Sequence, residues 1–130
     1  MKQESSIKDF TDLTTWQKGH ELVLTIYKLT IAFPDTERFG LMSQMRRSAV
    51  SITSNIAEGF SRRSFIDKKH FYVMAHGSLT ELQNQLLIAR DVEYISENDF
   101  KQTADLAVIV HKMLNGLIKS TSNKSMIHDS

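Results

Sequence analysis

Hydrophobic residues recur along this chain every three or four positions, the spacing that places side chains on one face of an α-helix. The first such segment begins near Thr14, where Thr14 and Gln17 fit a capping box. It ends at the Phe33–Pro34 step, because the residue before a proline is disfavoured in the α conformation. The first sixteen or so residues are expected to form a loose lead-in. The apolar face expected for this helix consists of Trp16, His20, Val23, Leu24, Tyr27 and Ile31.

The second segment runs from about Phe39 to Ala57 and is expected to stop at Gly59. The third opens with Ser64, a capping side chain, and with an acid, Asp67, that suits the positive end of the helix dipole. Its apolar residues follow a strict 3-4-3-4-3 spacing, the heptad pattern of helix bundles. The expected core stripes are Leu41, Met45, Ala49, Ile52 and Ile56 in the second segment, and Tyr72, Ala75, Leu79, Leu82, Leu86 and Ala89 in the third.

The fourth segment begins at the polar run 96–99, in which Ser96 is the expected cap. The ten residues after it, 121–130, are polar and are expected to be loose. The seam expected for this last helix consists of Phe100, Ala104, Ala107, His111, Leu114 and Ile118.

Four helices of about 20 residues, each about 30 Å long, with short connections predict an all-α protein, an antiparallel up-down-up-down four-helix bundle. The link at residues 59–64 is too short for a crossover, so the second and third helices should form a hairpin. At 130 residues the chain is expected to be one domain over 1–130, with its core at about 13–120.

Composition excludes several classes of protein. Cysteine is absent, which rules out disulfide scaffolds, thiolate metal sites and cysteine nucleophiles. A hydrophobic content of 41% against 24% charged residues is that of an ordinary soluble domain. The longest apolar run is the five residues Leu106–Val110, too short for a membrane span or a signal-peptide core. We therefore expect a cytoplasmic protein with no membrane partner.

The net charge is only +1, but residues 46–69 carry six basic and two acidic side chains. This basic cluster is either an electrostatic footprint for phosphates or a solvated helix end and loop. We treat it as a candidate nucleic-acid-binding site. The cluster consists of Arg46, Arg47, Arg62, Arg63, Lys68 and Lys69.

Two further helix faces are not explained by the core of one bundle. On the second helix a polar stripe lies beside the apolar one, and on the third a line with 4-3-4-3 spacing lies opposite the heptad seam. These lines are simply exposed, or form the interface of a symmetric oligomer, or line a catalytic cleft. The first consists of Gln44, Arg47, Ser48, Ser51, Asn55 and Glu58, and the second of Met74, Ser78, Glu81, Gln85 and Ile88.

The sequence contains no set of residues that predicts a reaction. A di-iron bundle needs repeated Glu-x-x-His pairs, and only the Asp67–His70 stretch approximates one. His111 in an apolar seam is more typical of a core residue than of a ligand. Glu58 and Glu81 are better explained as ion-pair partners of Arg46 or Arg47 than as an acid–base pair. We therefore expect no metal, no cofactor, no catalytic residues and no enzymatic activity.

A specific string of residues surrounds the second predicted helix and continues into the third. It comprises Trp16-Gln17, Phe33-Pro34, Glu37, Gly40-Leu41, Ser43-Gln44, Arg46-Arg47-Ser48-Ala49, Ser51, Ser54-Asn55-Ile56-Ala57-Glu58-Gly59, Phe71, Ala75-His76-Gly77-Ser78-Leu79, Glu81-Leu82 and Tyr94-Ile95. This string resembles the signature of the four-helix-bundle 23S rRNA intervening-sequence proteins, over about residues 10–120.

The resemblance implies a bacterial protein from a family named for segments inserted into 23S rRNA genes, whose members are not known as enzymes. That family is similar to the accessory proteins of diversity-generating retroelements, which form pentameric barrels, bind the reverse transcriptase and present a basic surface to nucleic acid. The resemblance therefore implies a homopentamer whose subunit contacts cover the two additional helix faces. It also implies RNA or a nucleic-acid enzyme as the partner.

Two functions remain open at this point. The first is a homo-oligomeric, ribosomal-protein-like module that neutralises RNA phosphates without reading bases, since no exposed aromatic platform is evident beside the arginines. The second is a protein-binding scaffold or adaptor with no nucleic-acid role.

Overall fold

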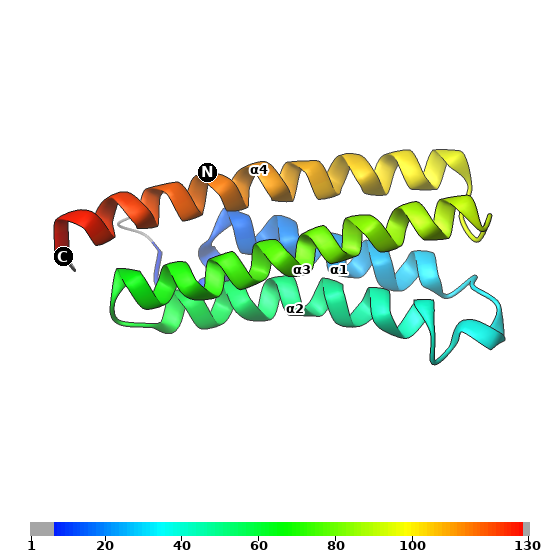
Figure 1. Cartoon of the computed structure of the whole chain (residues 1–130), viewed down its shortest axis with the longest axis horizontal. Helices are drawn as coiled ribbons and strands as arrows, with labels where there is room; N and C mark the ends of the chain where they lie inside the picture. Colours follow the sequence, from blue (N-terminus) through cyan, green and yellow to red (C-terminus); the bar gives the residue numbers. More distant parts are fainter. Residues whose placement is uncertain (1–6, 129–130) are drawn as a thin grey trace.

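The computed structural model describes residues 7–128, and every regular element in that range is helical. Four long helices lie beside one another, and the chain turns back at each connection, so that consecutive helices run in opposite directions (Figure 1). They are α1 (Thr14–Thr30), α2 (Leu41–Ser61), α3 (Phe65–Asp91) and α4 (Glu97–His128); the short 3-10 turns η2 (Phe10–Asp12) and η3 (Asp35–Glu37) precede α1 and α2.

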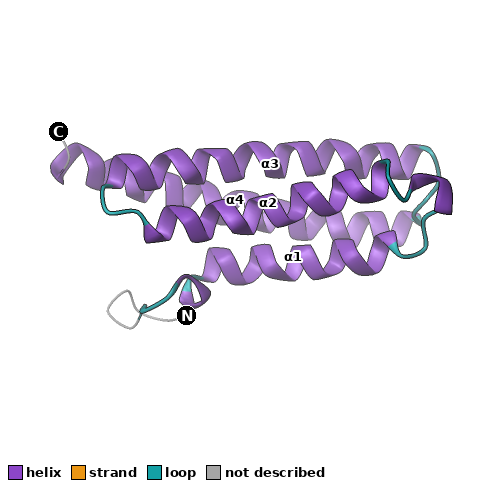
Figure 2. Ribbon diagram, turned by 90° about the horizontal axis from the view of Figure 1, so that it is seen from below, coloured by secondary structure: helices purple, strands orange, loops and turns teal. Residues whose placement is uncertain are grey.

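Each helix packs against two neighbours, as in a four-membered bundle. The α2–α3 contact is the most extensive, followed by α3–α4, and the contacts of α1 with α2 and α4 are smaller. Figure 2 shows α2 in front, with α1 and α3 on either side of it. Within residues 7–128 the diagonal pairs α1–α3 and α2–α4 do not approach closely. The prediction of an all-α four-helix bundle is confirmed.

The stripes predicted for the second and third helices form the centre of the core. The heptad residues of α3, from Tyr72 to Ala89, are all at most 3% exposed. In α2, Met45, Ile52 and Ile56 are completely buried. The heptad spacing therefore identified the packed face of α3 correctly.

The apolar face predicted for α1 is largely wrong, because threonine and glycine share the buried side with a different set of apolar residues. His20, Leu24, Tyr27 and Ile31 are exposed. The residues that α1 buries are Thr15, Gly19, Leu22, Val23, Ile26 and Thr30.

Two local features explain this face of α1. Gly19 allows close packing on α2, since a Cβ at this position would lie 3.1 Å from Thr53 Cγ2. The Thr30 hydroxyl donates to the Ile26 carbonyl at 2.7 Å, so this side chain is buried with its hydrogen bond satisfied. A pattern of apolar residues alone cannot detect such a face.

The seam of α4 is offset from the predicted one for a similar reason. Phe100, Ala104, His111 and Ile118 are only partly buried. Thr103 and Thr121 are buried instead, and their hydroxyls donate to the carbonyls of Asp99 and Leu117 at 2.8 and 2.7 Å. The buried line runs through Thr103, Ala107, Val110, Leu114 and Thr121.

The ends of the helices differ from expectation at four places. Helix α4 continues to His128, so the prediction of a loose segment from residue 121 is wrong; residues 129–130 lie outside the described part. Residues 7–13 carry the turn η2, whose capping box joins Asp9 and Asp12; residues 1–6 lie outside the described part. Thr14 forms no cap for α1. Helix α2 passes its expected stop at Gly59 by two residues.

The caps predicted for the third and fourth helices are confirmed. Ser64 Oγ accepts from the Asp67 amide at 3.1 Å, and Ser96 Oγ accepts from the Asp99 amide at 3.0 Å. Each bond satisfies an amide that has no partner within the first turn of its helix.

Glu37 ties together two connections at one end of the bundle. Its Oε1 accepts from the Leu41 amide at 3.0 Å, and its Oε2 accepts from the Tyr94 hydroxyl at 2.7 Å. Both bonds favour the ionised carboxylate and lower the pKa of Glu37, the Leu41 amide having the larger effect. The turn before α2 is thereby held against the α3–α4 connection.

Gly59 lies inside α2 where the helix meets α3 closely. A Cβ there would lie 2.6 Å from Tyr72 Cε1 and 3.1 Å from the Lys68 carbonyl oxygen. Tyr72 is only 3% exposed, so its ring has little room to move aside. Only glycine fits this crossing without displacing the core.

We therefore expect Gly59→Ala to lower the free energy of unfolding by up to about 2 kcal/mol, because overpacking costs about 1–3 kcal/mol and the gain in helix propensity offsets about 1 kcal/mol of that cost. Gly116→Ala is the matched control, since a Cβ on this α4 residue meets nothing within 4 Å. It should stabilise the protein by up to about 1 kcal/mol. Urea denaturation measures both, and an equal gain for the two variants would contradict the proposed clash.

Candidate interaction surfaces

The polar stripe predicted on the second helix and the line predicted on the third meet along the α2–α3 contact. Ser51 Oγ and Ser78 Oγ lie 2.8 Å apart and share a hydrogen bond. Asn55 Nδ2 donates to the Ser51 carbonyl at 2.9 Å. We call this line of contacts the polar seam; it consists of Arg47, Ser48, Ser51, Asn55, Ser78, Glu81 and Gln85.

Glu81 is the central acceptor of the polar seam. Its Oε1 accepts from Arg47 Nη2, from the buried Ser48 Oγ at 3.0 Å and from Gln85 Nε2 at 3.4 Å. Gln85 is 8% exposed, and its Oε1 has no hydrogen-bond partner in the described structure. The pairing of Glu81 with Arg47 expected from the sequence is thus present within one subunit.

The other residues predicted for an oligomer interface lie at the edges of this seam. Gln44 Oε1 accepts from Arg47 Nε at 3.0 Å, and Glu58 accepts from Arg62 at 3.0 Å. On α3, Met74 and Ile88 continue the line of the seam and are 45% and 43% exposed. The polar members of the line therefore bond mainly within the subunit, while two apolar members face outward.

The predicted basic cluster is divided in space. Arg46 turns toward α1, where its Nε donates to Thr30 Oγ1 at 2.9 Å and its guanidinium lies 4.6 Å from the centre of the Tyr27 ring. Arg47 belongs to the polar seam. Arg46 and Arg62 are sixteen positions apart, which corresponds to about 24 Å along a helix. The structure therefore does not bring all six cations together.

The other four cations gather at the α2–α3 connection, where α4 adds one more. Lys124 lies close enough to Lys68 that its charge, together with burial as the larger cause, lowers the pKa of Lys68. Figure 1 shows the last turns of α4 at the same end of the bundle as this connection. We call this surface the basic end; it consists of Arg62, Arg63, Lys68, Lys69 and Lys124.

The sequence does not predict Lys124 as part of this surface, because residues 121–130 are polar and are expected to be loose. Its position depends on the continuation of α4, which the buried Thr121 anchors. Lys68 has a structural contact as well, since its Nζ donates to the carbonyls of Phe60 at 2.6 Å and Gly59 at 3.4 Å. It caps the last turn of α2 while remaining part of the basic end.

Half-buried aromatic rings lie beneath the cations of the basic end, where the sequence predicted only that no exposed aromatic platform accompanies the arginines. Arg62 lies 4.5 Å from the centre of the half-buried Phe71 ring. Two more half-buried rings lie beneath cations: Phe60 is 5.4 Å from Lys68 and Phe65 is 5.8 Å from Lys124. Because these pairs join different helices or turns, their spacing in the sequence does not predict them.

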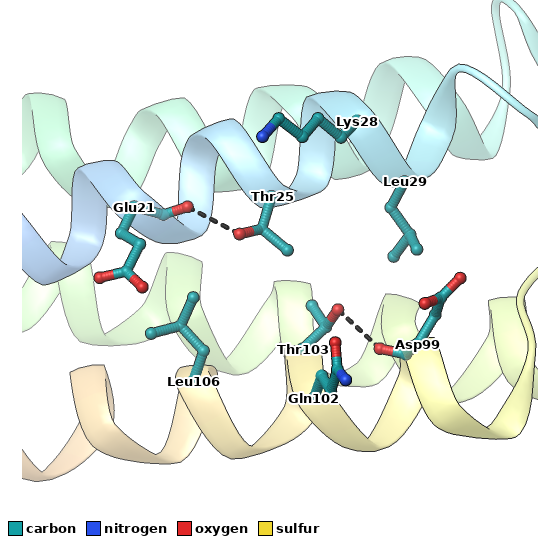
Figure 3. Close-up of a pocket in the computed structure, with 8 residues that line it drawn as sticks. All are labelled: Glu21, Thr25, Lys28, Leu29, Asp99, Gln102, Thr103 and Leu106. Carbon is teal, nitrogen blue, oxygen red and sulfur yellow. Dashed lines mark hydrogen bonds between the residues drawn. The ribbon is translucent and has the colours of Figure 1, made fainter.

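A groove of about 390 Å³ lies between α1 and α4 (Figure 3). Its two threonines bond to their own helices: Thr25 Oγ1 donates to the Glu21 carbonyl at 2.9 Å, and Thr103 donates to that of Asp99. Figure 3 shows the carboxylates of Glu21 and Asp99 on opposite walls. The groove therefore lacks an activated hydroxyl and a convergent acid–base pair.

Within the described part of the chain, no group of three or more His, Asp or Glu side chains is arranged to hold a metal ion. His76 and His111 form an edge-to-face pair between α3 and α4, with ring centres 4.8 Å apart. No described helix is both long and apolar enough to cross a membrane.

A comparison with protein families identifies the family of this chain. The family model described as 23S rRNA-intervening sequence protein matches residues 11–116. The chain belongs to this family. A search of the curated proteins found no match.

A solved structure shares the fold of this 23S rRNA-intervening sequence protein. It is a protein of unknown function from the S23 ribosomal protein family of Bacteroides thetaiotaomicron. The two chains are 24% identical and superpose with a TM-score of 0.74, over 82% of this chain and 99% of the other. At this identity the comparison supports the bundle architecture.

The polar seam predicts unequal effects for two exposed glutamates of α2 and α3. Glu81→Ala removes the acceptor of the buried Ser48 hydroxyl and should lower the free energy of unfolding by about 1–3 kcal/mol. Glu58→Ala removes a surface ion pair with Arg62, which lies one helical turn away. This substitution should change the free energy of unfolding by less than about 0.5 kcal/mol. Urea denaturation of both variants provides the comparison; equal losses would show that the seam contributes no more than a surface ion pair.

Proposed function

We propose that this family member is a non-enzymatic homo-oligomer, the pentamer implied by the family resemblance, that associates with RNA or a ribonucleoprotein through its basic end. The observation that carries the RNA association is the meeting of five cations from the α2–α3 connection and α4. Arg46 and Arg47 are left out of the proposed RNA contact because they are engaged at Thr30 and Glu81.

The oligomer contact is proposed along the polar seam. Met74 and Ile88 expose apolar surface on either side of Glu81, whose side chain is also exposed. Apolar side chains beside exposed polar groups are typical of subunit interfaces. A neighbouring copy would cover this apolar surface and leave the basic end at the periphery.

The charge distribution favours attraction of RNA to the basic end and not to the protein surface as a whole. The whole chain has a net charge of +1, while residues 58–69, which supply four cations of the basic end, contain two acids, Glu58 and Asp67. Closed symmetry repeats this end once per subunit, so a long strand would meet several such surfaces.

Met74→Glu and Ile88→Glu should each dissociate the oligomer, because they place an unpaired charge in the proposed contact. Ile109→Glu is the matched control, since Ile109 on α4 is 44% exposed and Ile88 is 43% exposed. Light scattering gives the particle mass, and circular dichroism checks that the helices remain. An unchanged mass for both seam variants would overturn the assigned interface.

RNA affinity should fall steeply with salt, with a slope of about −0.7 in log–log form for each phosphate contacted on a single strand. Replacing Arg62, Arg63 and Lys69 together by Glu should remove about three contacts and flatten the slope by about 2. Lys68 is spared because it caps α2. Filter binding at several salt concentrations measures the effect.

The matched control makes the same three charge changes at the opposite end of the bundle, at Lys28, Arg38 and Lys101, which are all exposed. This control variant should bind RNA nearly as the wild type does. An equal loss in both triple variants would contradict a specific role for the basic end.

The second candidate is a protein-binding adaptor with no nucleic-acid role. The observation that favours it is a groove of about 540 Å³ beside α1 and α2, where Phe39 is 88% exposed next to Tyr27, Met42 and Val50. Large exposed apolar side chains around a groove are typical of protein contacts. The adaptor function is supported if the protein assembles but binds no RNA at low salt.

A further inference from the structure

The basic end contains a hollow as well as a charged surface. Its volume is about 320 Å³, the lower end of the range for ligand pockets, and it suits a single ring-bearing group. Phe60 from α2, Phe65 and Tyr72 from α3, and Leu117 from α4 form much of its wall. The remaining lining residues are Ile7, Leu13, Lys68, Ser120, Thr121 and Lys124.

The lining combines apolar and aromatic walls with two cations. Lys68 and Lys124 both line the hollow and repel each other, and this repulsion adds to the burial that lowers the pKa of Lys68. A ligand that carries a negative charge would relieve the repulsion. Burial raises the pKa of Tyr72 to about 12, so its hydroxyl stays protonated at neutral pH.

The charges around the hollow favour a chain of anions over a single small anion. Arg62, Arg63 and Lys69 lie at the same connection but do not line the hollow. A single carboxylate or phosphate held by Lys68 and Lys124 would engage only two of the five cations of the basic end, of which Arg62 already pairs with Glu58. A nucleic acid strand would place one group in the hollow and its neighbouring phosphates on the outer cations.

We propose that the hollow takes one unpaired nucleobase of a single-stranded RNA, with the adjoining phosphate at Lys68 and Lys124. This inference deepens the proposed function and rests on it. The flat base would lie against the aromatic wall of Phe60 and Phe65, a contact that any base can make. A duplex keeps its bases stacked inside, so it cannot fill the hollow.

The experiment compares three probes of equal length by fluorescence anisotropy at low salt: an oligouridine, an abasic ribose-phosphate strand and a blunt RNA duplex. The oligouridine should bind about tenfold more tightly than the abasic strand, the order of effect expected for one stacked base. Phe65→Leu should remove this preference while leaving the affinity for the abasic strand unchanged.

Phe100→Leu is the matched control variant. Phe100 is also half-buried beneath a cation, with Arg90 4.8 Å from its ring centre, but it lies at the first turn of α4, far from the basic end. It should keep the tenfold preference. Uridine monophosphate added as a competitor distinguishes a free nucleotide from a strand, because it should displace the oligouridine only at far higher concentration.

The outcomes separate the two proposals. Equal affinity for the oligouridine and the abasic strand overturns the base pocket and leaves the RNA association intact. No binding of any probe overturns the RNA association as well. Tighter binding of the duplex, or displacement by the mononucleotide at equal concentration, overturns the single-stranded ligand. These comparisons use the wild-type protein, so they hold even if Phe65→Leu fails to fold.

Discussion

The contact between α2 and α3 is the constraint on which the rest of this bundle depends. A heptad stripe supplies its buried apolar half, and the polar seam supplies directional bonds such as Ser51–Ser78 and Ser48–Glu81. Apolar packing alone tolerates sliding along the helix axis, whereas paired hydroxyls and a shared carboxylate favour one register. Gly59 fixes the distance at the other end by admitting the Tyr72 ring.

This register determines where the charged side chains lie. The connection between α2 and α3 is only three residues long, so Arg62 and Arg63 are held at the turn whatever their neighbours do. Lys68 then reaches back to the last carbonyls of α2, and α4 passes the same end on the other side of α3. One packed interface thus creates both the seam and the basic end.

The sequence predicts the parts of this structure that depend on strong periodicity or on local capping, such as the heptad of α3 and the caps at Ser64 and Ser96. It fails where threonine or glycine replaces apolar residues at the core, as at Gly19 and Thr103, because their burial depends on the neighbouring helix. The same distinction holds for the candidate surfaces. The sequence predicts the two polar lines from their helical spacing. It does not predict that the basic cluster is divided in space or that Lys124 joins it, because both depend on how the helices pack.

The unequal lengths of the helices determine where the sequence of this chain can vary without loss of the fold. Helix α4 has 32 residues and α1 has 17, so the final turns of α4 have no counterpart in α1. None of residues 122–126 is buried, yet Lys124 among them lines the hollow. Substitutions at these positions can accumulate without endangering folding, so the charge and shape of the hollow can diverge among related proteins while the architecture is preserved.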